Sequence, residues 1–419
     1  MREFWKKNKI LFIFVIALFL LMPSTFNVPS ISDSHMIVIG LGIDLSEEGK
    51  YEVSIQMVVP KQNSGFKSNV KIVSAEDDTI SKGFNKLSLH FGKKLALGQC
   101  EYILFNERAT EKNIVELLDP IFRESYVSDS CLLFTTGDSA NELMKLSSDI
   151  QDEYSYNLTT LLEYNEKRNY SSEINLKKLY KSYFSPNNCF VIPKIEIKDK
   201  STDGIDTTNT SSGQSSGSSE SGSSDSSSGG GESSSENKVI SNDGQLIIMK
   251  NSTKLTEVST DELKGVEWIF GEALELDIDI KDFSDDFYEN ADIGLRTEQR
   301  SVSSSVYFED DKPVLDITIL MLVKITHIEQ PNQPIELYDS TFNYLTESLG
   351  QAIREKVVTE INDTKAFLTG MYADLFDIYG RFNKYEYKKW GDFLATLENP
   401  DDYLSEYVLK TNIILNKIH

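Results

Sequence analysis

Hydrophobic and polar positions in the first part of the chain predict strands joined by a tight turn. Apolar residues from Tyr51 to Val59 alternate with Glu52, Ser54 and Gln56, which is the period of two expected of a half-buried strand. An apolar run over residues 36–44 precedes it, and the segment Glu47–Lys50 between the two runs is a turn candidate. The two runs therefore predict an antiparallel hairpin.

Apolar residues spaced three and four apart then predict helices between further strands. The helical positions are Ile80, Phe84, Leu87 and Phe91, followed by Ile114, Leu117, Leu118 and Ile121 in a helix expected to end near Pro120. Residues 101–105 and 131–135 have the composition of strands, and a third helix is expected over residues 141–145. This mixture predicts an α+β or mixed-sheet domain.

The second half of the chain combines alternating strands with one long helix. Strands are predicted over residues 274–280, 315–325 and 407–415. Between the last two, apolar residues recur at every third or fourth position, at Phe342, Leu345, Leu349, Ile353, Val357 and Ile361. With Asp339 as N-cap and Gly370 as the stop, this pattern predicts a helix of about 30 residues, or about 45 Å. Such a helix is long enough to lie across a whole sheet.

A polar segment divides the chain. Ser and Gly supply 23 of the 39 residues from 199 to 237, and Ile205 is the only aliphatic residue there. Such a segment cannot bury enough apolar surface to offset the entropy of ordering it. We therefore expect a disordered linker over 199–237 between two α+β bodies, 36–198 and 238–419, the second with two subdomains as an alternative. The fold class is α+β, with two or three mixed helix/sheet domains and the long helix of the last domain packed on an antiparallel or mixed sheet.

Residues 1–35 have the features of a signal or anchor segment. A basic start, with Arg2, Lys6, Lys7 and Lys9, leads into 13 apolar residues from Ile10 to Met22. A helix of this length spans only about 20 Å, less than the ~30 Å of a bilayer core. Cleavage and retention as a single anchor both stay open, and the absence of a clear cleavage site favours retention. In either case the rest of the chain is expected outside the cytoplasm. The first cysteine is Cys100, so no lipoprotein cysteine follows the apolar run.

Charge and composition exclude several classes of function. The chain of 419 residues has 42 basic and 66 acidic side chains, a net charge of −24. This balance argues against nucleic-acid binding and against broad adhesion to an anionic membrane surface. Its three cysteines (Cys100, Cys131 and Cys189) are too scattered for a disulfide framework and are expected to be buried thiols.

Residue patterns for catalysis are weak. Gly40-Leu41-Gly42 lacks the third glycine and the helix of a nucleotide-binding fingerprint, so we interpret it as a tight bend before a turn. Glu275, Asp277 and Asp279 fall on one face of a predicted strand and are expected to be solvated. An exported hydrolase would need an acid pair brought together in space. We therefore expect no enzyme activity, no cofactor and no metal.

Several segments, in order along the chain, resemble the Ger(x)C family, the C subunits of nutrient germinant receptors of bacterial spores. The resembling segments are Ile39–Asp44 with Gly49–Val53, Asn85–Leu95, Phe190–Ile197, Leu263–Gly271, Asp377–Gly380 and Tyr387–Trp390. They are similar to the family's opening strand pair "ALGID…GKY.V", its "LS…GRKL" helix, its "P.IEL" strand, its "E..G..WL.G" helix and its "DIFGFG…YP..WK" region. The family is normally lipidated on a cysteine that this chain lacks, so the N-terminal segment would have to serve as its tether.

The resemblance implies a non-enzymatic subunit on the outer face of the spore inner membrane, needed for germination. Its partners would be a multi-span A subunit and a transporter-like B subunit that senses amino acids or sugars. Trp268, Tyr379 and Trp390 match family positions. They are interpreted as core aromatics that lock helix to sheet or, alternatively, as partner contacts. The alternative function is an extracytoplasmic small-ligand binding module that acts alone.

Overall fold

The structure is a computed structural model of the full chain. It describes residues 35–59, 69–124, 126–146, 174–199, 238–242, 244–270, 275–330 and 345–416. The segment predicted as a signal or anchor lies outside these ranges except for His35, and the predicted linker lies outside them except for Asp199. None of the helices in the described ranges is both long enough and apolar enough to cross a bilayer.

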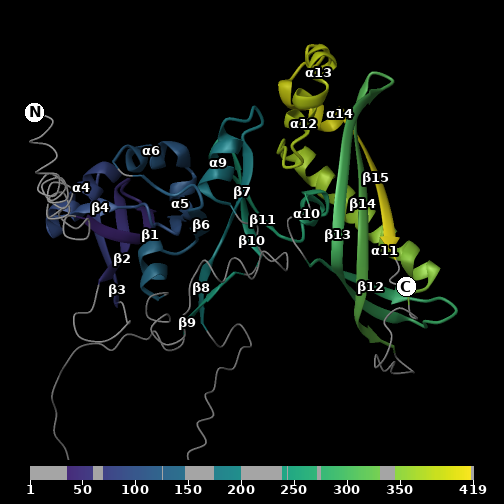
Figure 1. The fold of residues 1–419 in the computed structure, drawn as a ribbon, viewed down its shortest axis with the longest axis horizontal. Helices are drawn as coiled ribbons and strands as arrows, with labels where there is room; N and C mark the ends of the chain where they lie inside the picture. Colours follow the sequence, from purple (N-terminus) through teal and green to yellow (C-terminus); the bar gives the residue numbers. More distant parts are fainter. Residues whose placement is uncertain are drawn as a thin grey trace, which may run out of the picture.

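The N-terminal part is a mixed sheet with helices on both faces (Figure 1). The strands lie in the order β3-β2-β1-β5-β6, with β5 parallel to β1 and β6, and β2 antiparallel to both its neighbours. Their bounds are β1 His35–Leu45, β2 Tyr51–Val59, β3 Asn69–Asp77, β5 Tyr102–Asn106 and β6 Leu132–Thr136, and the short β4 Lys94–Ala96 pairs with the start of β1. The predicted hairpin over residues 36–59 is therefore confirmed.

Alternate side chains along these strands pack into two separate hydrophobic cores, one on each face of the sheet. Ile103 and Phe105 pack with α4 (Ile80–Phe91) and α6 (Ile114–Glu124) on one face of the sheet. Tyr102 and Leu104 pack with the helix over residues 140–146 on the other face. The short helix α5 (Glu107–Thr110) directly follows β5. The three predicted helices are confirmed, but α6 continues past Pro120 to Glu124, so the expected end at the proline is wrong.

Gly40 and Gly42 lie inside strand β1, and the prediction of a tight bend there is wrong. A Cβ atom on Gly40 would lie 2.4 Å from the ring of Tyr102, and one on Gly42 would lie 2.7 Å from the sulfur of Met144. The missing side chains therefore make room for a tyrosine from β5 and for the helix over residues 140–146.

A small central sheet joins the two halves of the chain. Its order is β11-β10-β7, from β7 (Cys189–Pro193), β10 (Gln245–Lys250) and β11 (Thr253–Ser259). Along β10, Ile247 and Met249 belong to the N-terminal core, whereas Leu246 and Ile248 belong to the C-terminal core. The sheet is thus the wall between the two cores, as its middle position in Figure 1 also shows.

Strands of the two predicted bodies pair with each other. Strands from either side of residues 200–237 are hydrogen-bonded to each other, β7 to β10 and also β8 (Glu196–Asp199) to β9 (Lys238–Ser241). The predicted bodies, residues 36–198 and 238–419, thus share hydrogen-bonded strands, and the predicted linker between them stays a prediction. The strands before and after the segment share a sheet because β10 presents apolar residues on both of its faces.

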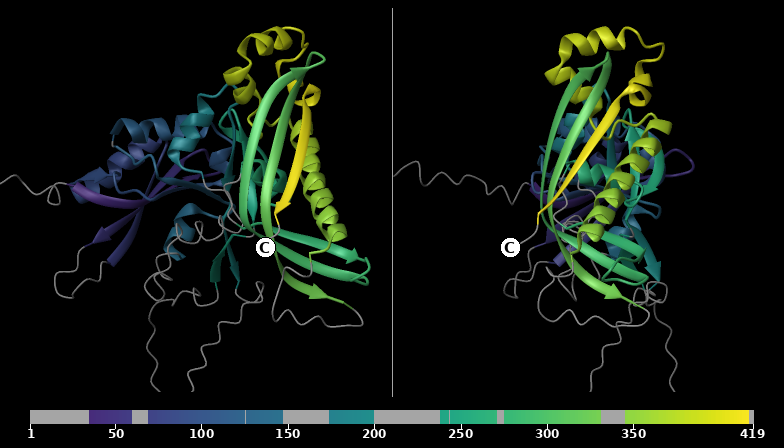
Figure 2. Two further views of the ribbon diagram at one scale, coloured as in Figure 1. Left: turned by 45° about the vertical axis from the view of Figure 1, so that its right-hand side comes forward. Right: turned by 90° about the vertical axis from the view of Figure 1, so that its right-hand side faces the viewer.

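The C-terminal part is a curved sheet with one long helix against it (Figure 2). The order is β12-β13-β14-β15, with β14 and β15 parallel and the other pairs antiparallel. The strand bounds are β12 Asp277–Phe283, β13 Ala291–Glu309, β14 Lys312–Glu329 and β15 Val408–Asn416. Helix α9 (Leu176–Tyr183) precedes β7 of the central sheet. The helices that follow β11 are α10 Lys264–Phe270, α11 Glu347–Gly370, α12 Ile378–Tyr385, α13 Tyr387–Leu394 and α14 Tyr403–Glu406. The predicted α+β class, with a long helix on a mixed sheet, is confirmed.

The long helix α11 is shorter than predicted. It has 24 residues, and its N-cap is Thr346, whose Oγ1 accepts a hydrogen bond of 3.1 Å from the Leu349 N–H. The predicted cap, Asp339, lies outside the described residues. The predicted stop is confirmed, since Gly370 is the last residue of the helix. Ile353, Val357 and Ile361 are fully buried, as the spacing of apolar residues requires.

Candidate functional site

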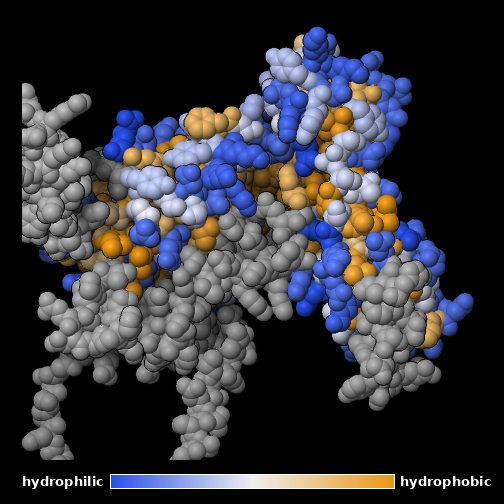
Figure 3. Space-filling view, in the orientation of Figure 1, coloured by the Kyte–Doolittle hydropathy of each residue, from blue (hydrophilic) through white to orange (hydrophobic). Residues whose placement is uncertain are grey.

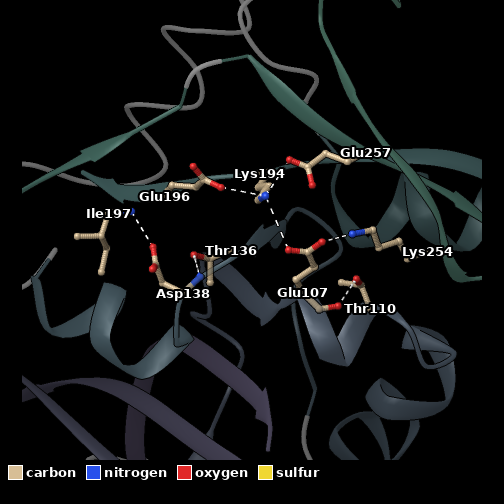
Figure 4. Close-up of polar contacts among 9 residues, drawn as sticks. All are labelled: Glu107, Thr110, Thr136, Asp138, Lys194, Glu196, Ile197, Lys254 and Glu257. Carbon is tan, nitrogen blue, oxygen red and sulfur yellow. Dashed lines mark hydrogen bonds and ion pairs between the residues drawn. The ribbon is translucent and has the colours of Figure 1, made fainter. Parts of the chain in front are cut away.

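A buried lysine links the N-terminal sheet to the central sheet. Lys194 directly follows β7, and its side chain is only 8% exposed. Its Nζ lies 2.8 Å from Oε1 of Glu257 on β11 and 2.9 Å from Oε1 of Glu196 (Figure 4). Oε2 of Glu107, on α5 of the N-terminal part, is 3.7 Å away and the same carboxylate also binds Lys254. We call Lys194, Lys254, Glu107, Glu196 and Glu257 the Lys194 cluster.

The charges in the Lys194 cluster stabilise one another. Burial opposes the positive charge on Lys194, but the carboxylates of Glu257, Glu196 and Glu107 outweigh this and raise the pKa of Lys194. Burial likewise opposes the charge on Glu107, and Lys254 and Lys194 together bring the pKa of Glu107 below its ordinary value. Lys194 and Glu107 are therefore both ionised near neutral pH, and the cluster acts as a polar clamp between two sheets.

An acidic hollow of about 610 Å³ lies beside this clamp, at the carboxyl ends of β1, β5 and β6. Its lining includes Glu107 of the clamp together with Asp44, Glu47, Glu52, Glu76, Glu111 and Asp138, and Arg108 is its basic residue. Arg108 pairs with Glu47 at 2.9 Å, and Asp138 accepts a 2.9 Å hydrogen bond from the N–H of Ile197 (Figure 4). Within the described residues no group of acidic, His and Cys side chains has the arrangement of a metal site.

Asp44 has a structural task in that hollow. Its carboxylate accepts hydrogen bonds from the Ala140 N–H (2.7 Å), the Asn141 N–H (3.1 Å) and the Ser139 hydroxyl (3.0 Å). Burial raises the pKa of Asp44 above its ordinary value, and these donors oppose the rise without cancelling it. Asp44 therefore caps the helix over residues 140–146 and ties it to the end of β1.

The three aromatic residues singled out in the sequence lie in or beside the C-terminal core. Trp268 on α10 is fully buried, and its Nε1 donates a 2.8 Å hydrogen bond to Oε2 of Glu360 on α11. Trp390 is 1% exposed, and the partly buried Tyr379 contacts it edge to face with the ring centroids 5.7 Å apart. The structure thus brings Tyr379 and Trp390 together and gives Trp268 a different neighbour. Trp268 and Trp390 present no surface to a partner, so contact with a partner stays a prediction for Tyr379 alone.

Polar contacts that the sequence analysis did not anticipate join the central sheet to the C-terminal part. Lys250 at the end of β10 donates to Oδ2 of Asp401 and to the carbonyl of Tyr372, both at 2.7 Å. Asn187, just before β7, donates to Asp374 and Asp377 at 3.4 Å each. The apolar run Leu246–Met249, bounded by Gly244 and Asn251, was the sequence signal for β10 and hence for the position of Lys250.

An apolar hollow lies at this second junction. It has a volume of about 270 Å³, and its apolar lining is Ile174, Phe190, Val191, Val266, Phe270 and Leu375. Its charged lining includes Lys178 and Lys181 of α9 together with Asp374 and Asp377. The recessed orange surface between the two parts of the molecule in Figure 3 agrees with this position.

The fold and its two polar junctions define a multi-part α+β protein whose charged residues hold its parts together. Comparisons with known proteins give the family. The model described as "Spore germination protein N-terminal domain" matches residues 31–197, and the one described as "Spore germination B3/ GerAC like, C-terminal" matches residues 243–411. The chain therefore belongs to the Ger(x)C family of spore germination proteins, as the sequence resemblance predicted.

Individual relatives are more distant. The spore germination protein GerQC of Bacillus cereus is 30% identical over 122 residues, which are 29% of this chain and 33% of the relative. The matched stretch thus spans about a third of that relative's length. A structure titled "Crystal Structure of the GerBC protein" is 12% identical, with a TM-score of 0.49 over 91% of this chain and 97% of that chain. Both family models describe spore germination proteins, so the family membership of this chain rests on matches in both of its halves.

Proposed function

We propose that this chain is a non-enzymatic, extracytoplasmic subunit of a nutrient germinant receptor. The observation that carries the proposal is the match of two spore-germination family models over both halves of the chain. The chain would be held at the spore inner membrane by its N-terminal segment and would assemble with membrane-spanning A and B subunits.

The state of the reactive side chains supports a non-enzymatic role. Burial raises the pKa of the Cys189 thiol to about 12, so this thiol is protonated and a poor nucleophile at neutral pH. Cys100 and Cys131 are also buried and unpaired. Asp44 and Lys194, the buried charged groups nearest to the acidic hollow, are engaged in a helix cap and a clamp. Asp44 and Lys194 thus each have a structural task that accounts for their position.

Deleting the gene tests the proposal. Spores should form normally but fail to germinate with some nutrients, and the protein should co-purify with A and B subunits from detergent-solubilised spore membranes. A variant with Phe14→Asp and Leu18→Asp in the apolar run should disappear from the membrane fraction and fail to restore germination. Normal germination of the deletion strain with every germinant would contradict the proposal, as would turnover of a substrate by the purified chain.

The apolar hollow at the second junction favours one other candidate, a small-ligand binding module that acts alone. Apolar walls with a few charged groups are typical of small-molecule sites, although the volume of about 270 Å³ is slightly below their usual range of about 300–1,000 Å³. Calorimetry of the full chain with nutrient germinants distinguishes the two functions. Binding by the chain alone that is lost on filling the hollow with Val266→Trp would support this candidate over the receptor subunit.

A further inference from the structure

The corner between α12 and α13 exposes two tyrosines surrounded by lysines. Tyr385 and Tyr387 are 65% and 71% exposed, although most tyrosines of a folded body bury the larger part of their ring. Lys384, Lys388 and Lys389 are exposed beside them. We call residues 384–389 the Tyr-Lys corner. An exposed aromatic pair at a helix junction costs solubility and therefore needs an explanation.

The corner is positively charged in an acidic protein. It has three lysines and one acid, Glu386, whereas the whole chain has a net charge of −24. Within the described residues none of its three ammonium groups forms an ion pair, and Lys384 lies 4.8 Å from the centroid of the Tyr385 ring. Asp392 is the next acid along α13 and is exposed. By contrast, Lys281, Lys356 and Lys410 of the C-terminal part form ion pairs with Asp292, Glu360 and Glu309.

Buried aromatic residues hold the corner rigidly. Trp390 stacks on Phe382 and Phe393, with ring centroids 4.9 and 5.5 Å apart, and so fixes α13 against α12. The backbone also continues across the junction, because the Glu386 N–H donates to Phe382 and the Trp390 N–H donates to Glu386. The backbone that bears the two exposed tyrosines is therefore already ordered, so binding through them costs little conformational entropy.

The corner is an outer end of the molecule. α12 and α13 form one extremity of the C-terminal part, at the top of Figures 1 and 2. The same end is mostly blue and pale blue in Figure 3. The two hollows described above include none of residues 384–389 in their linings. A projecting surface of this kind suits a broad, yielding surface better than it suits a small ligand.

We propose that the Tyr-Lys corner docks on the anionic surface of the lipid bilayer. Tyrosine places its apolar ring at the depth of the lipid headgroups with its hydroxyl in water, and lysine is attracted to anionic headgroups. Because the rest of the chain is acidic, only the corner is attracted to an anionic bilayer. The N-terminal segment attaches the chain to the membrane, and the corner then sets the orientation of the attached body. This inference rests on the membrane location in the proposed function.

A probe at the corner tests the inference in the full chain. The environment-sensitive dye NBD is attached to the cysteine of the Tyr387→Cys variant. Labelling of the folded protein is selective for this position because the native thiols of Cys100, Cys131 and Cys189 are buried. The protein is reconstituted with vesicles of phosphatidylcholine and phosphatidylglycerol that contain a spin-labelled lipid. We expect the dye at 387 to shift to the blue and to be quenched, whereas vesicles of phosphatidylcholine alone give little quenching. The matched control is Ser303→Cys, at an exposed position on β13 of the same body, which should stay unquenched.

A charge-reversed variant completes the test. Combining Lys384→Glu, Lys388→Glu and Lys389→Glu should reduce quenching at 387 severalfold while the chain still floats with the vesicles. A chain that floats but leaves the dye in water overturns the inference and leaves the proposed membrane tether standing. Equal quenching in neutral vesicles, or protection of the dye only by co-purified receptor subunits, also overturns it, the latter in favour of an acidic protein surface. A chain that does not float overturns both the inference and the proposed tether.

Discussion

The hydroxyl of Tyr403 donates a 3.0 Å hydrogen bond to Oδ2 of Asp374 inside the C-terminal core. The same carboxylate accepts the N–H groups of Ile378 and Tyr379, at 2.8 and 2.9 Å, and so binds the first turn of α12. Burial raises the pKa of Asp374, and these three donors lower it by less than burial raises it. Asp374 is thus a buried carboxyl group held in the core by the hydrogen bonds that it accepts.

The raised pKa predicts how stability changes with pH. The folded chain holds the Asp374 proton more tightly than the unfolded chain, in which the carboxyl has a pKa of 3.8. The stability due to this group is fully present below pH 3.8 and is lost as the pH rises through the raised, folded-state pKa. Asp374→Asn removes this titration. Urea unfolding at a series of pH values should therefore show a smaller loss of stability above pH 3.8 for the variant than for the wild type.

Asp292 is the matched control, because its shift has the opposite sign. The Asp282 N–H and Lys281 lower the pKa of Asp292, so its contribution is present above pH 3.8 and is lost as the pH falls. Asp292→Asn should therefore not change how the free energy of unfolding varies with pH above 3.8. If Asp374→Asn and the wild type lose stability in parallel from pH 3.8 to neutral, burial does not raise the pKa of Asp374.

The close packing of Tyr102 on Gly40 predicts a cost for adding a single methyl group. The Tyr102 hydroxyl donates a 2.5 Å hydrogen bond to Gln56 across the sheet, and a Cβ on Gly40 would overlap the tyrosine ring. Gly40→Ala should therefore lower the free energy of unfolding by about 1–3 kcal/mol, measured in urea. Gly391→Ala is the control, because nothing lies within 4 Å of its Cβ position and alanine favours a helix. Equal stabilities of the two variants would refute the packing argument.

Local sequence pattern was enough to predict most of the outer elements. Period-two alternation located β2 and β14, and steps of three and four located α4, α6 and α11, because each of these elements buries one face. Element ends were less certain. The helix α11 begins after Thr346 because that hydroxyl accepts the Leu349 N–H, and the apolar spacing alone did not distinguish this cap from Asp339.

The arrangement of the central sheet could not be predicted in the same way. Strand β10 pairs with β7, although more than 50 residues separate the two strands in the sequence. The continuous apolar run Leu246–Met249 predicts a buried strand but does not indicate which strand it pairs with. The Lys194 cluster was missed for the same reason, since Glu107 and Glu257 are 150 residues apart and only the sheet pairing brings them to one lysine. The aromatic residues were found by family resemblance and interpreted as core residues, and the fold buries Trp268 and Trp390 as that interpretation expects.

The Lys194 cluster predicts a loss of stability when its central cation is removed. Lys194→Met keeps the apolar length of the side chain but leaves Glu257 and Glu196, which are 33% and 37% exposed, close together without the cation. We expect the free energy of unfolding to fall by about 1–3 kcal/mol, less than for a fully buried pair because water screens the carboxylates. Lys410→Met, which removes an exposed pair with Glu309, is the control and should change stability little. If Glu257→Gln does not reduce the cost of Lys194→Met, the two residues are not coupled.

The indole nitrogens of Trp268 and Trp390 predict different costs for the same substitution. Trp268→Phe removes the 2.8 Å hydrogen bond to Glu360, whereas in the part of the chain that the structure describes Nε1 of Trp390 has no acceptor. Because both indoles are buried and both variants lose similar ring area, Trp268→Phe should cost about 1–2 kcal/mol more in urea unfolding. Equal costs would show that the Glu360 contact contributes nothing.

The same pair separates a core role from a contact with a partner. If both tryptophans act in the core, germination of spores with either variant should decrease only in proportion to the amount of folded protein in the membrane. Tyr379→Phe is the comparison, because Tyr379 is partly exposed while its ring still packs on Trp390. A germination defect of Tyr379→Phe at a normal protein level would assign its hydroxyl to a partner. The same result for Trp390→Phe would contradict the core interpretation, because that ring is 1% exposed.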